Sequence, residues 1–388
     1  MISKNIKKVV SFLSKKGKET SGMVDDLLTN PKKERVGDEP KRYVHIGYPK
    51  SASTALQKGY LGRHNQLLHL GCGNRAKKNY WDDHGYISAE INKVVEVDLR
   101  YKNAFAYDAD AVKGIFAKYF NQAKQDKMVH AVGLSNENFC FSWHGGVDVT
   151  EKARRLLDIF GYGTQIVMII RNQIDLVNSL YKENVRFGYP GDFEDFIRYM
   201  WIYKDRNFTY EFCFEKVAQV YQDLFGVENV KILFFEQLKE NGEQFLRILS
   251  EAIGIDYYNL KLDKEYNKQL SDKQLAIKRI LNQRYPHTFG KGKFDVIDDH
   301  RYVPYYTDEV QVGIPDELYF DHRIRRYFNK LSAELSGLVD ISPISLNWNS
   351  DNAVRLRNLF VESNQLFSER NPALRTDLER YKYLNFAI

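Results

Sequence analysis

The residues best suited to chemistry lie in one stretch, where an apolar segment runs through a turn of lysine and hydroxyl residues into a helical pattern. The stretch reads Tyr43-Val-His-Ile-Gly47-Tyr-Pro49-Lys50-Ser51-Ala52-Ser53-Thr54-Ala-Leu-Gln57. A helix N-terminus presents backbone N–H groups without acceptors and a partial positive charge, so Lys50 and three hydroxyls there predict a site for phosphate or sulfate. The residue directly before Lys50 is a proline and not the glycine of an ordinary ATP or GTP loop, which makes that pattern a poor match.

A second basic residue closes another apolar segment. The run 165–170 ends at Arg171, and the helical pattern that follows carries Ser179, eight residues after the arginine. Ligands of parallel α/β sheets bind beyond the carboxyl ends of the strands, so Lys50 and Arg171 are expected to face the same crevice. Two basic anchors at neighbouring strand ends indicate a ligand with phosphate groups at two places.

The elements that position these residues alternate between short apolar runs and longer amphipathic segments. Continuous apolar runs suit parallel strands that are covered on both faces. The sequence therefore predicts an α/β fold, with a P-loop-like parallel β-sheet flanked by helices on both faces. The predicted strands are 43–47, 128–134, 165–170 and 230–235, and segments with helical periodicity include 150–160, 174–187 and 215–225.

Taken together, these motifs resemble those of the PAPS-dependent sulfotransferases, which use 3′-phosphoadenosine 5′-phosphosulfate (PAPS) as donor, and the resemblance is to bacterial and carbohydrate members. Their phosphosulfate loop is similar to 49–54, and their 3′-phosphate element has the spacing of Arg171 and Ser179. Three further segments resemble family features in the same order: the aromatic-Glu-x-Leu motif at 235–238, the Lys- and Gly-containing loop at 290–293 and the closing helix at 360–366.

The resemblance implies in-line transfer of a sulfuryl group from PAPS to a hydroxyl or amine, with release of 3′-phosphoadenosine 5′-phosphate (PAP). Lys50 is suited to neutralise the charge that grows on the leaving phosphate. The planar guanidinium of Arg171 is suited to the 3′-phosphate, and Ser179 adds a hydrogen bond. No metal is implied. The cofactor-binding residues implied are Lys50, Ser51, Ala52, Ser53, Thr54, Arg171, Ser179, Lys291 and Lys293.

The general base is less well defined. Glu137 follows the predicted strand 128–134 and is the first candidate, with a structural carboxylate as the alternative. His144 is the second candidate, and His69 and Glu90 remain open.

Ala52 departs from the family pattern, which usually has glycine there. A Cβ disfavours left-handed backbone conformations. Alanine is harmless if the position is right-handed helical, and a distorted loop is expected otherwise.

Composition narrows the class of protein. The chain has 388 residues, 43% hydrophobic content and a formal charge of +6. This mild positive charge suits an anionic ligand but is lower than the charge expected of a dedicated nucleic-acid-binding protein. Its three cysteines form no CxxC pair, and no His or Cys cluster has metal-ligand spacing, so no metal is expected. The absence of a signal-peptide pattern and of a long apolar run predicts a cytoplasmic protein.

The chain is expected to divide into a tail and one catalytic domain. Residues 1–40 are lysine-rich, with Ile2, Ile6, Val9 and Leu13 at helical spacing. Such a tail predicts either peripheral contact with an anionic membrane or a solvated arm. Residues 41–388 are expected to form a single sulfotransferase-like domain, in which the irregular segment 285–315 is a candidate lid or substrate loop.

Two other interpretations stay open. Residues 67–74 resemble the glycine-rich motif of S-adenosylmethionine-dependent methyltransferases, with 94–99 as an expected strand ending in acidic residues. That interpretation leaves Lys50, Arg171 and Ser179 unexplained. The third interpretation is a non-catalytic nucleotide-binding or membrane-associated protein of the same fold.

The resemblance favours a glycan or glycolipid as the acceptor, and a small-molecule alcohol or amine is the alternative. Aromatic and basic residues in 285–306, among them His287, His300 and Arg301, could stack on and hydrogen-bond a sugar. The sequence gives no prediction of oligomeric state.

Overall fold

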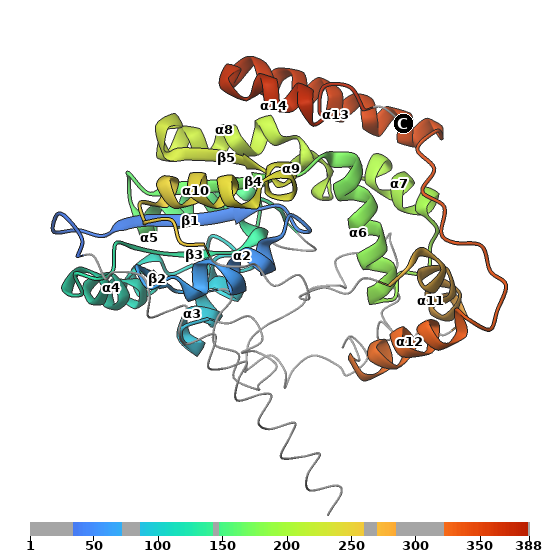
Figure 1. Ribbon diagram of the computed structural model, residues 1–388, viewed down its shortest axis with the longest axis horizontal. Coiled ribbons are helices and arrows are strands. Elements are labelled where there is room, and N and C mark those ends of the chain that lie inside the picture. The colour runs from blue at the N-terminus through green and yellow to red at the C-terminus, as the bar shows by residue number, and fades with distance from the viewer. Residues whose placement is uncertain (1–33, 72–85, 143–146, 260–269, 285–321, 387–388) are drawn as a thin grey trace, which may run out of the picture.

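A computed structural model describes residues 34–71, 86–142, 147–259, 270–284 and 322–386. Its centre is a five-stranded sheet with the order β2-β3-β1-β4-β5, in which every adjacent pair is parallel (Figure 1). The strands are β1 (Lys41–Gly47), β2 (Leu67–His69), β3 (Ala131–Ser135), β4 (Gln165–Ile170) and β5 (Val230–Phe234). The prediction of an α/β fold with a parallel sheet is confirmed.

Alternating residues of the central strands bury side chains on opposite faces of the sheet, as the period of two in a β-strand requires. In β1, Val44 and Ile46 belong to the larger hydrophobic core, whereas Tyr43 belongs to the smaller one. In β4, Met168 lies in the larger core and Ile169 in the smaller. Both faces are therefore covered, which explains why these strands read as continuous apolar runs.

Helices on each side supply the two cores. On one face, α2 (Ser53–Gly59) and α10 (Gly242–Ile253) contribute Leu56, Leu246 and Leu249. On the other face lie α5 (Val149–Phe160), α8 (Phe214–Phe225) and α13 (Asp351–Arg370). Several of these helices begin at a side-chain cap; in α5, for example, Asp148 accepts a hydrogen bond from the N–H of Glu151.

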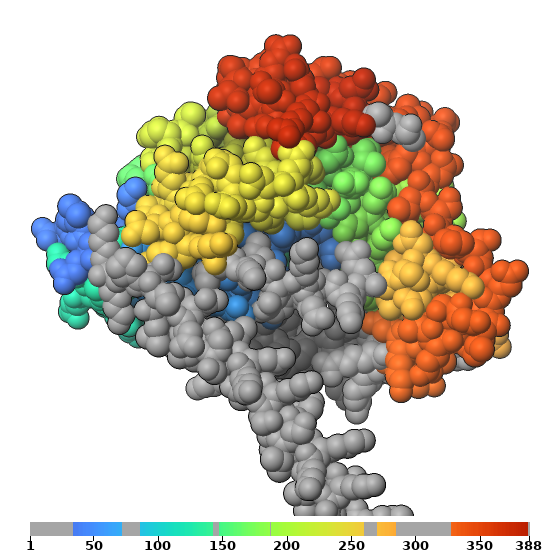
Figure 2. Space-filling view, viewed as in Figure 1, coloured from blue at the N-terminus to red at the C-terminus, as the bar shows by residue number. Residues whose placement is uncertain are grey.

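The remaining helices surround the sheet and the helices that cover its two faces. In Figure 2, the C-terminal residues, in red, form the surface above the yellow region that includes α9 and α10. The other helices are α3 (Ala89–Lys93), α4 (Ala109–Gln125), α6 (Gln173–Phe187), α7 (Phe193–Ile202), α9 (Phe235–Glu240), α11 (Asp272–Arg284), α12 (His322–Leu335) and α14 (Arg375–Arg380). A π-helical turn spans Val94–Asp98, and short 3-10 turns span Leu61–Arg63, Glu137–Phe139, Phe208–Phe212, Val227–Asn229 and Pro372–Leu374.

The observed elements match most sequence predictions within one to three residues at each boundary. Strand 165–170 is confirmed at both ends, and the predicted strand 128–134 lies at 131–135.

The prediction of a strand at 94–99 is wrong, because these residues are helical. Glu96 is buried there, accepts a 2.5 Å hydrogen bond from Tyr86 and pairs with Arg100, so it is not a free acidic strand end for a ribose. This result argues against the methyltransferase interpretation.

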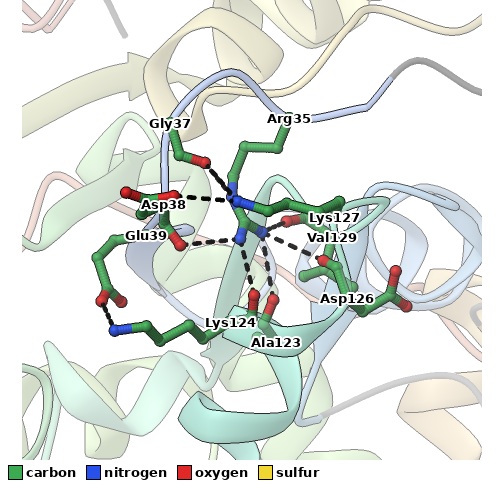
Figure 3. Close-up of polar contacts among 9 residues, drawn as sticks. All are labelled: Arg35, Gly37, Asp38, Glu39, Ala123, Lys124, Asp126, Lys127 and Val129. Carbon is green, nitrogen blue, oxygen red and sulfur yellow. Dashed lines mark hydrogen bonds and ion pairs between the residues drawn. The ribbon is translucent and has the colours of Figure 1, made fainter.

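Arg35 ties the segment before β1 to the end of α4 (Figure 3). Its guanidinium is almost fully buried and has backbone carbonyl oxygens as its hydrogen-bond acceptors, several of them at the C-terminus of α4, where cations are favoured. The acceptors are the carbonyls of Gly37, Asp38, Ala123, Lys124, Asp126 and Val129. These bonds fix where the chain enters the sheet.

Replacing Arg35 should therefore be costly. We expect Arg35→Ala to lower the free energy of unfolding by about 3 kcal/mol, because several buried carbonyls lose a charged donor at once. Lys127→Gln is the control: it removes an exposed ion pair with Asp38 and an exposed 3.3 Å hydrogen bond to the Gly37 carbonyl, and it should cost less than about 0.5 kcal/mol. Urea denaturation of both variants measures the difference; equal losses would show that Arg35 does not fix this junction.

Candidate active site at the carboxyl edge of the sheet

The loop between β1 and α2 has an unusual backbone. It begins with a 3.0 Å hydrogen bond from the Tyr48 N–H to the Ile169 carbonyl of the neighbouring strand β4. Two non-glycine residues then adopt positive φ angles, Lys50 at 66° and Ala52 at 63°. This pair of left-handed residues turns the chain from the strand into the helix.

Ala52 thus has a left-handed backbone conformation, which glycine adopts without cost, and not the right-handed helical conformation in which alanine would be harmless. An L-residue pays roughly 1–2 kcal/mol for it. The first turn of α2 is nevertheless regular, because the Leu56 N–H donates to the Ala52 carbonyl at 3.0 Å. The alanine is therefore accommodated by local strain while the first turn of the helix stays closed.

The loop offers several donors to an anion. By helix geometry, the N–H groups of Ser53, Thr54 and Ala55 have no acceptor within α2. The side chain of Ser51 is fully buried, and its Oγ has no hydrogen-bond partner among the described residues. A buried hydroxyl without a partner is costly, so this atom indicates a position that a ligand or a water molecule fills.

Arg171 lies directly beside this loop. Its Nη1 donates a 2.7 Å hydrogen bond to the carbonyl oxygen of Lys50, and its guanidinium stacks on the Phe235 ring at 4.9 Å. Its Nε, also buried, finds no acceptor in the described part of the chain. Burial lowers the pKa of Arg171, and the nearby acids Asp175 and Glu236 oppose this shift. The two basic elements singled out in the sequence are therefore in contact.

The turn after Arg171 is held by the C-terminal part of the chain. Asn364 of α13 and Gln173 exchange two amide hydrogen bonds of 2.8 and 3.0 Å. Glu236 accepts from the Asn172 N–H at 3.1 Å and from the Tyr383 hydroxyl at 3.0 Å. The segments 235–238 and 360–366, which the sequence analysis singled out, thus position Arg171 from two sides.

Ser179 is buried on α6, two turns beyond Arg171. Glu183 is four residues further on, on the same face of the helix, and its Oε2 lies 3.4 Å from Lys50 Nζ. Ser179 therefore faces the side of α6 that meets the loop. Sequence analysis missed Glu183, although its spacing from Ser179 was a signal for it.

Glu137 lies just after β3, in the same region. Burial raises the pKa of Glu137, while the nearby Ser53 hydroxyl and the charge of Lys50 lower it. A carboxyl group with a raised pKa close to Lys50 has the character of a general acid or base. Of the base candidates, Glu90 is exposed and bonded to Lys118, and His69 Nδ1 shares a 2.7 Å hydrogen bond with Tyr43.

A second group that sequence analysis missed lies beneath the loop. His45 of β1 is almost completely buried, and its Nδ1 shares a 2.6 Å hydrogen bond with Ser135 Oγ. The Gln57 amide of α2 donates to the same hydroxyl at 2.9 Å. These three side chains link the ends of β1 and β3 to α2, the elements that carry Lys50 and Glu137.

Three predicted site residues, His144, Lys291 and Lys293, lie outside the described residues, as do the tail and the segment 285–315. Within the described ranges, no group of three or more His, Cys, Asp or Glu side chains is arranged to hold a metal ion. In the same ranges, no helix is long and apolar enough to span a membrane.

Comparison with known proteins gives similarity at the level of structure only. No family model and no curated protein matches the chain. Three solved structures to which it is similar are a sulfotransferase from Alicyclobacillus acidocaldarius, the sulfotransferase domain of the Synechococcus PCC 7002 olefin synthase, and mouse sulfotransferase SULT7A1 complexed with PAP. Their sequence identities are 17%, 11% and 11%, and their TM-scores are 0.37, 0.33 and 0.29. The matches cover 60%, 84% and 80% of this chain and 87%, 97% and 94% of the others.

The strain at Ala52 can be measured. Ala52→Gly should raise the free energy of unfolding by about 0.5–1 kcal/mol, because relief of the left-handed strain exceeds the entropy that glycine adds to the unfolded chain. Ala55→Gly, three residues away inside α2, should lower it by about 1 kcal/mol. Chemical denaturation of the two variants checks both signs, and a destabilised Ala52→Gly protein would show that the position is unstrained.

Stability should also depend on the protonation of His45. Burial lowers the pKa of His45 to about 3, and the charge of His69 adds to this shift. An unfolded histidine takes up its proton near pH 6.5, so between pH 6.5 and 3 the unfolded state binds more protons and stability falls as the pH falls. We expect the free energy of unfolding to fall by about 2 kcal/mol between pH 6.5 and 4.5, a loss that His45→Asn should remove. Urea titrations at the two pH values measure it; an equal loss in the variant would exclude His45 as the source.

Proposed function

We propose that this protein is a sulfotransferase that moves a sulfuryl group from PAPS to a hydroxyl or amine of an acceptor and releases PAP. The observation that carries the proposal is the hydrogen bond from Arg171 to the carbonyl of Lys50, which joins the two predicted phosphate elements into one site. The residues fit such a ligand because Ser51 Oγ and Arg171 Nε are buried polar atoms without partners among the described residues.

Each side chain has a chemical role in this proposal. PAPS supplies the sulfuryl group, whose bond to the bridging phosphate oxygen breaks as its bond to the acceptor forms. Lys50 neutralises the charge that grows on that phosphate, and the loop N–H groups of Ser53 and Thr54 hold its other oxygens. Arg171 and Ser179 bind the 3′-phosphate. Glu137 accepts the acceptor's proton, since its raised pKa brings it closer to the pH at which it works.

The proposed acceptor is a glycan or glycolipid. The resemblance of the motifs supports this acceptor, as do the aromatic and basic residues in 285–306, which lie outside the described residues. A small alcohol or amine is the alternative, and a panel of both acceptor types in the transfer assay separates them.

The reaction class is tested with two labelled donors. The protein is incubated with ³⁵S-labelled PAPS and, separately, with methyl-labelled S-adenosylmethionine. We expect slow release or transfer of the sulfuryl label and no transfer of the methyl label. Tight binding of S-adenosylmethionine without binding of PAP would exclude the proposal. Binding of PAP without hydrolysis or transfer by any preparation would favour the non-catalytic interpretation.

The roles of the two basic residues can be separated. Arg171→Ala should weaken PAP binding at least 100-fold, because it removes the planar donor for the 3′-phosphate. Lys50→Ala should keep PAP binding within about tenfold and lower turnover by a factor on the order of 1,000, because the lysine acts mainly on charge that develops during transfer. Calorimetry with PAP and turnover of labelled PAPS measure the two effects. Lys58→Ala, at the far end of α2, is the control and should behave as wild type; equal effects on binding from Lys50→Ala and Arg171→Ala would refute this division of roles.

A further inference from the structure

Lys50, the residue at the centre of the proposed site, is paired with a carboxylate that the proposed reaction does not use. Its Nζ lies 3.4 Å from Glu183 Oε2, and the two side chains are 17% and 19% exposed. The residues come from different elements, the loop after β1 and the helix α6, so their meeting is a property of the fold. Figure 1 shows α6 leading from the edge of the sheet toward α11.

The Glu183 carboxylate is held in a fixed orientation. While Oε2 faces Lys50, Oε1 pairs with Arg186 one turn further along α6. Both carboxylate oxygens are therefore engaged. Lys50 in turn starts from a restrained backbone, because its φ is 66° and its carbonyl oxygen accepts the hydrogen bond from Arg171.

A carboxylate here opposes the binding of an anion. A phosphate on the loop must attract the Lys50 ammonium away from Glu183 and must also lie near the Glu183 negative charge. The same charge acts on Glu137, whose pKa it raises. Charges that interact across a partly buried site are weakly screened, so they influence binding more than an exposed ion pair does.

We propose that Glu183 is a positioning residue for Lys50: it holds the ammonium beside the loop in the ligand-free protein and yields it to the phosphate that binds there. This inference rests on the proposed function, since it takes the loop as the phosphate site. Glu183 weakens ground-state binding of the nucleotide and improves the position of Lys50 during transfer. Binding and turnover are thus affected in opposite directions.

The binding part is tested by calorimetry with PAP. Glu183→Gln keeps the shape of the side chain and removes its charge, so we expect PAP to bind about tenfold more tightly, equivalent to about 1.4 kcal/mol. Glu183→Ala should show the same direction and provides a second variant without the charge. Glu183→Asp keeps the carboxylate and should stay within about threefold of wild type.

A matched control comes from the neighbouring residue of the same helix. Lys182 of α6 pairs with Asp272 of α11 at 2.7 Å. Asp272→Asn removes one negative charge, as Glu183→Gln does, but it removes it from α11, which contacts α6. The ion pair between Lys50 and Glu183 stays intact in this variant. We expect its PAP affinity to remain within twofold of wild type.

The positioning part is tested by turnover of labelled PAPS. Glu183→Gln should lower KM for PAPS and also lower kcat, by about tenfold, because Lys50 is no longer held beside the loop. If Glu183 had a merely structural role, Glu183→Gln would raise KM for PAPS or leave both KM and kcat unchanged. Glu183→Asp, which keeps the carboxylate, should restore most of kcat.

The outcomes separate this inference from the proposed function. If wild type binds PAP in an Arg171-dependent way but both Glu183→Gln and Glu183→Ala bind it no more tightly than wild type or the Asp272→Asn control, the inference on Glu183 is wrong and the proposed function stands. If no form of the protein binds PAP, both are wrong.

Discussion

The parallel pairing of β1 with β3 on one side and β4 on the other is the constraint on which the site depends. His45 pairs in register with Ser135, and Gly47 with Ile169, so the three strands end at the same edge of the sheet. The chain leaving each of these ends carries a different functional group: the Lys50 loop after β1, Glu137 after β3 and Arg171 after β4. Because the register is fixed by side chains that alternate between two buried faces, a slip of one residue would exchange the cores and separate the three groups.

Sequence reasoning succeeded for the buried, continuous elements. Strands β1, β4 and β5 are covered on both faces, and their apolar runs stand out against the helical periodicity around them. It failed for two segments near the edge of the sheet. The strand β2 has only three residues, all partly exposed, which is too short for a pattern. Residues 94–98 combine β-branched residues with acids and looked like a strand, yet Glu96 pairs with Arg100 one helical turn away, and tertiary packing overrode the local propensity.

The same division holds for the candidate site. Lys50, Arg171 and Ser179 lie in local motifs that spacing and the family resemblance single out, and in the structure the Arg171 guanidinium contacts the Lys50 carbonyl. Their binding roles stay predictions. The Lys50–Glu183 pair and the hydrogen bond between His45 and Ser135 join residues 133 and 90 positions apart, and no local pattern reports such contacts. The left-handed conformation of Ala52 could likewise not be predicted from the sequence. A left-handed alanine is tolerated there because the surrounding strand ends and the first turn of α2 determine the loop, which is typical of strain at functional sites.

The central claim is that the Lys50 loop and Arg171 bind one nucleotide between them. A crystal structure of the protein with saturating PAP tests this claim most directly. We predict the 5′-phosphate at the N–H groups of Ser53 and Thr54, within reach of Lys50, and the 3′-phosphate on the guanidinium of Arg171. PAP bound elsewhere on the protein, or a loop left empty at saturating PAP, would contradict it.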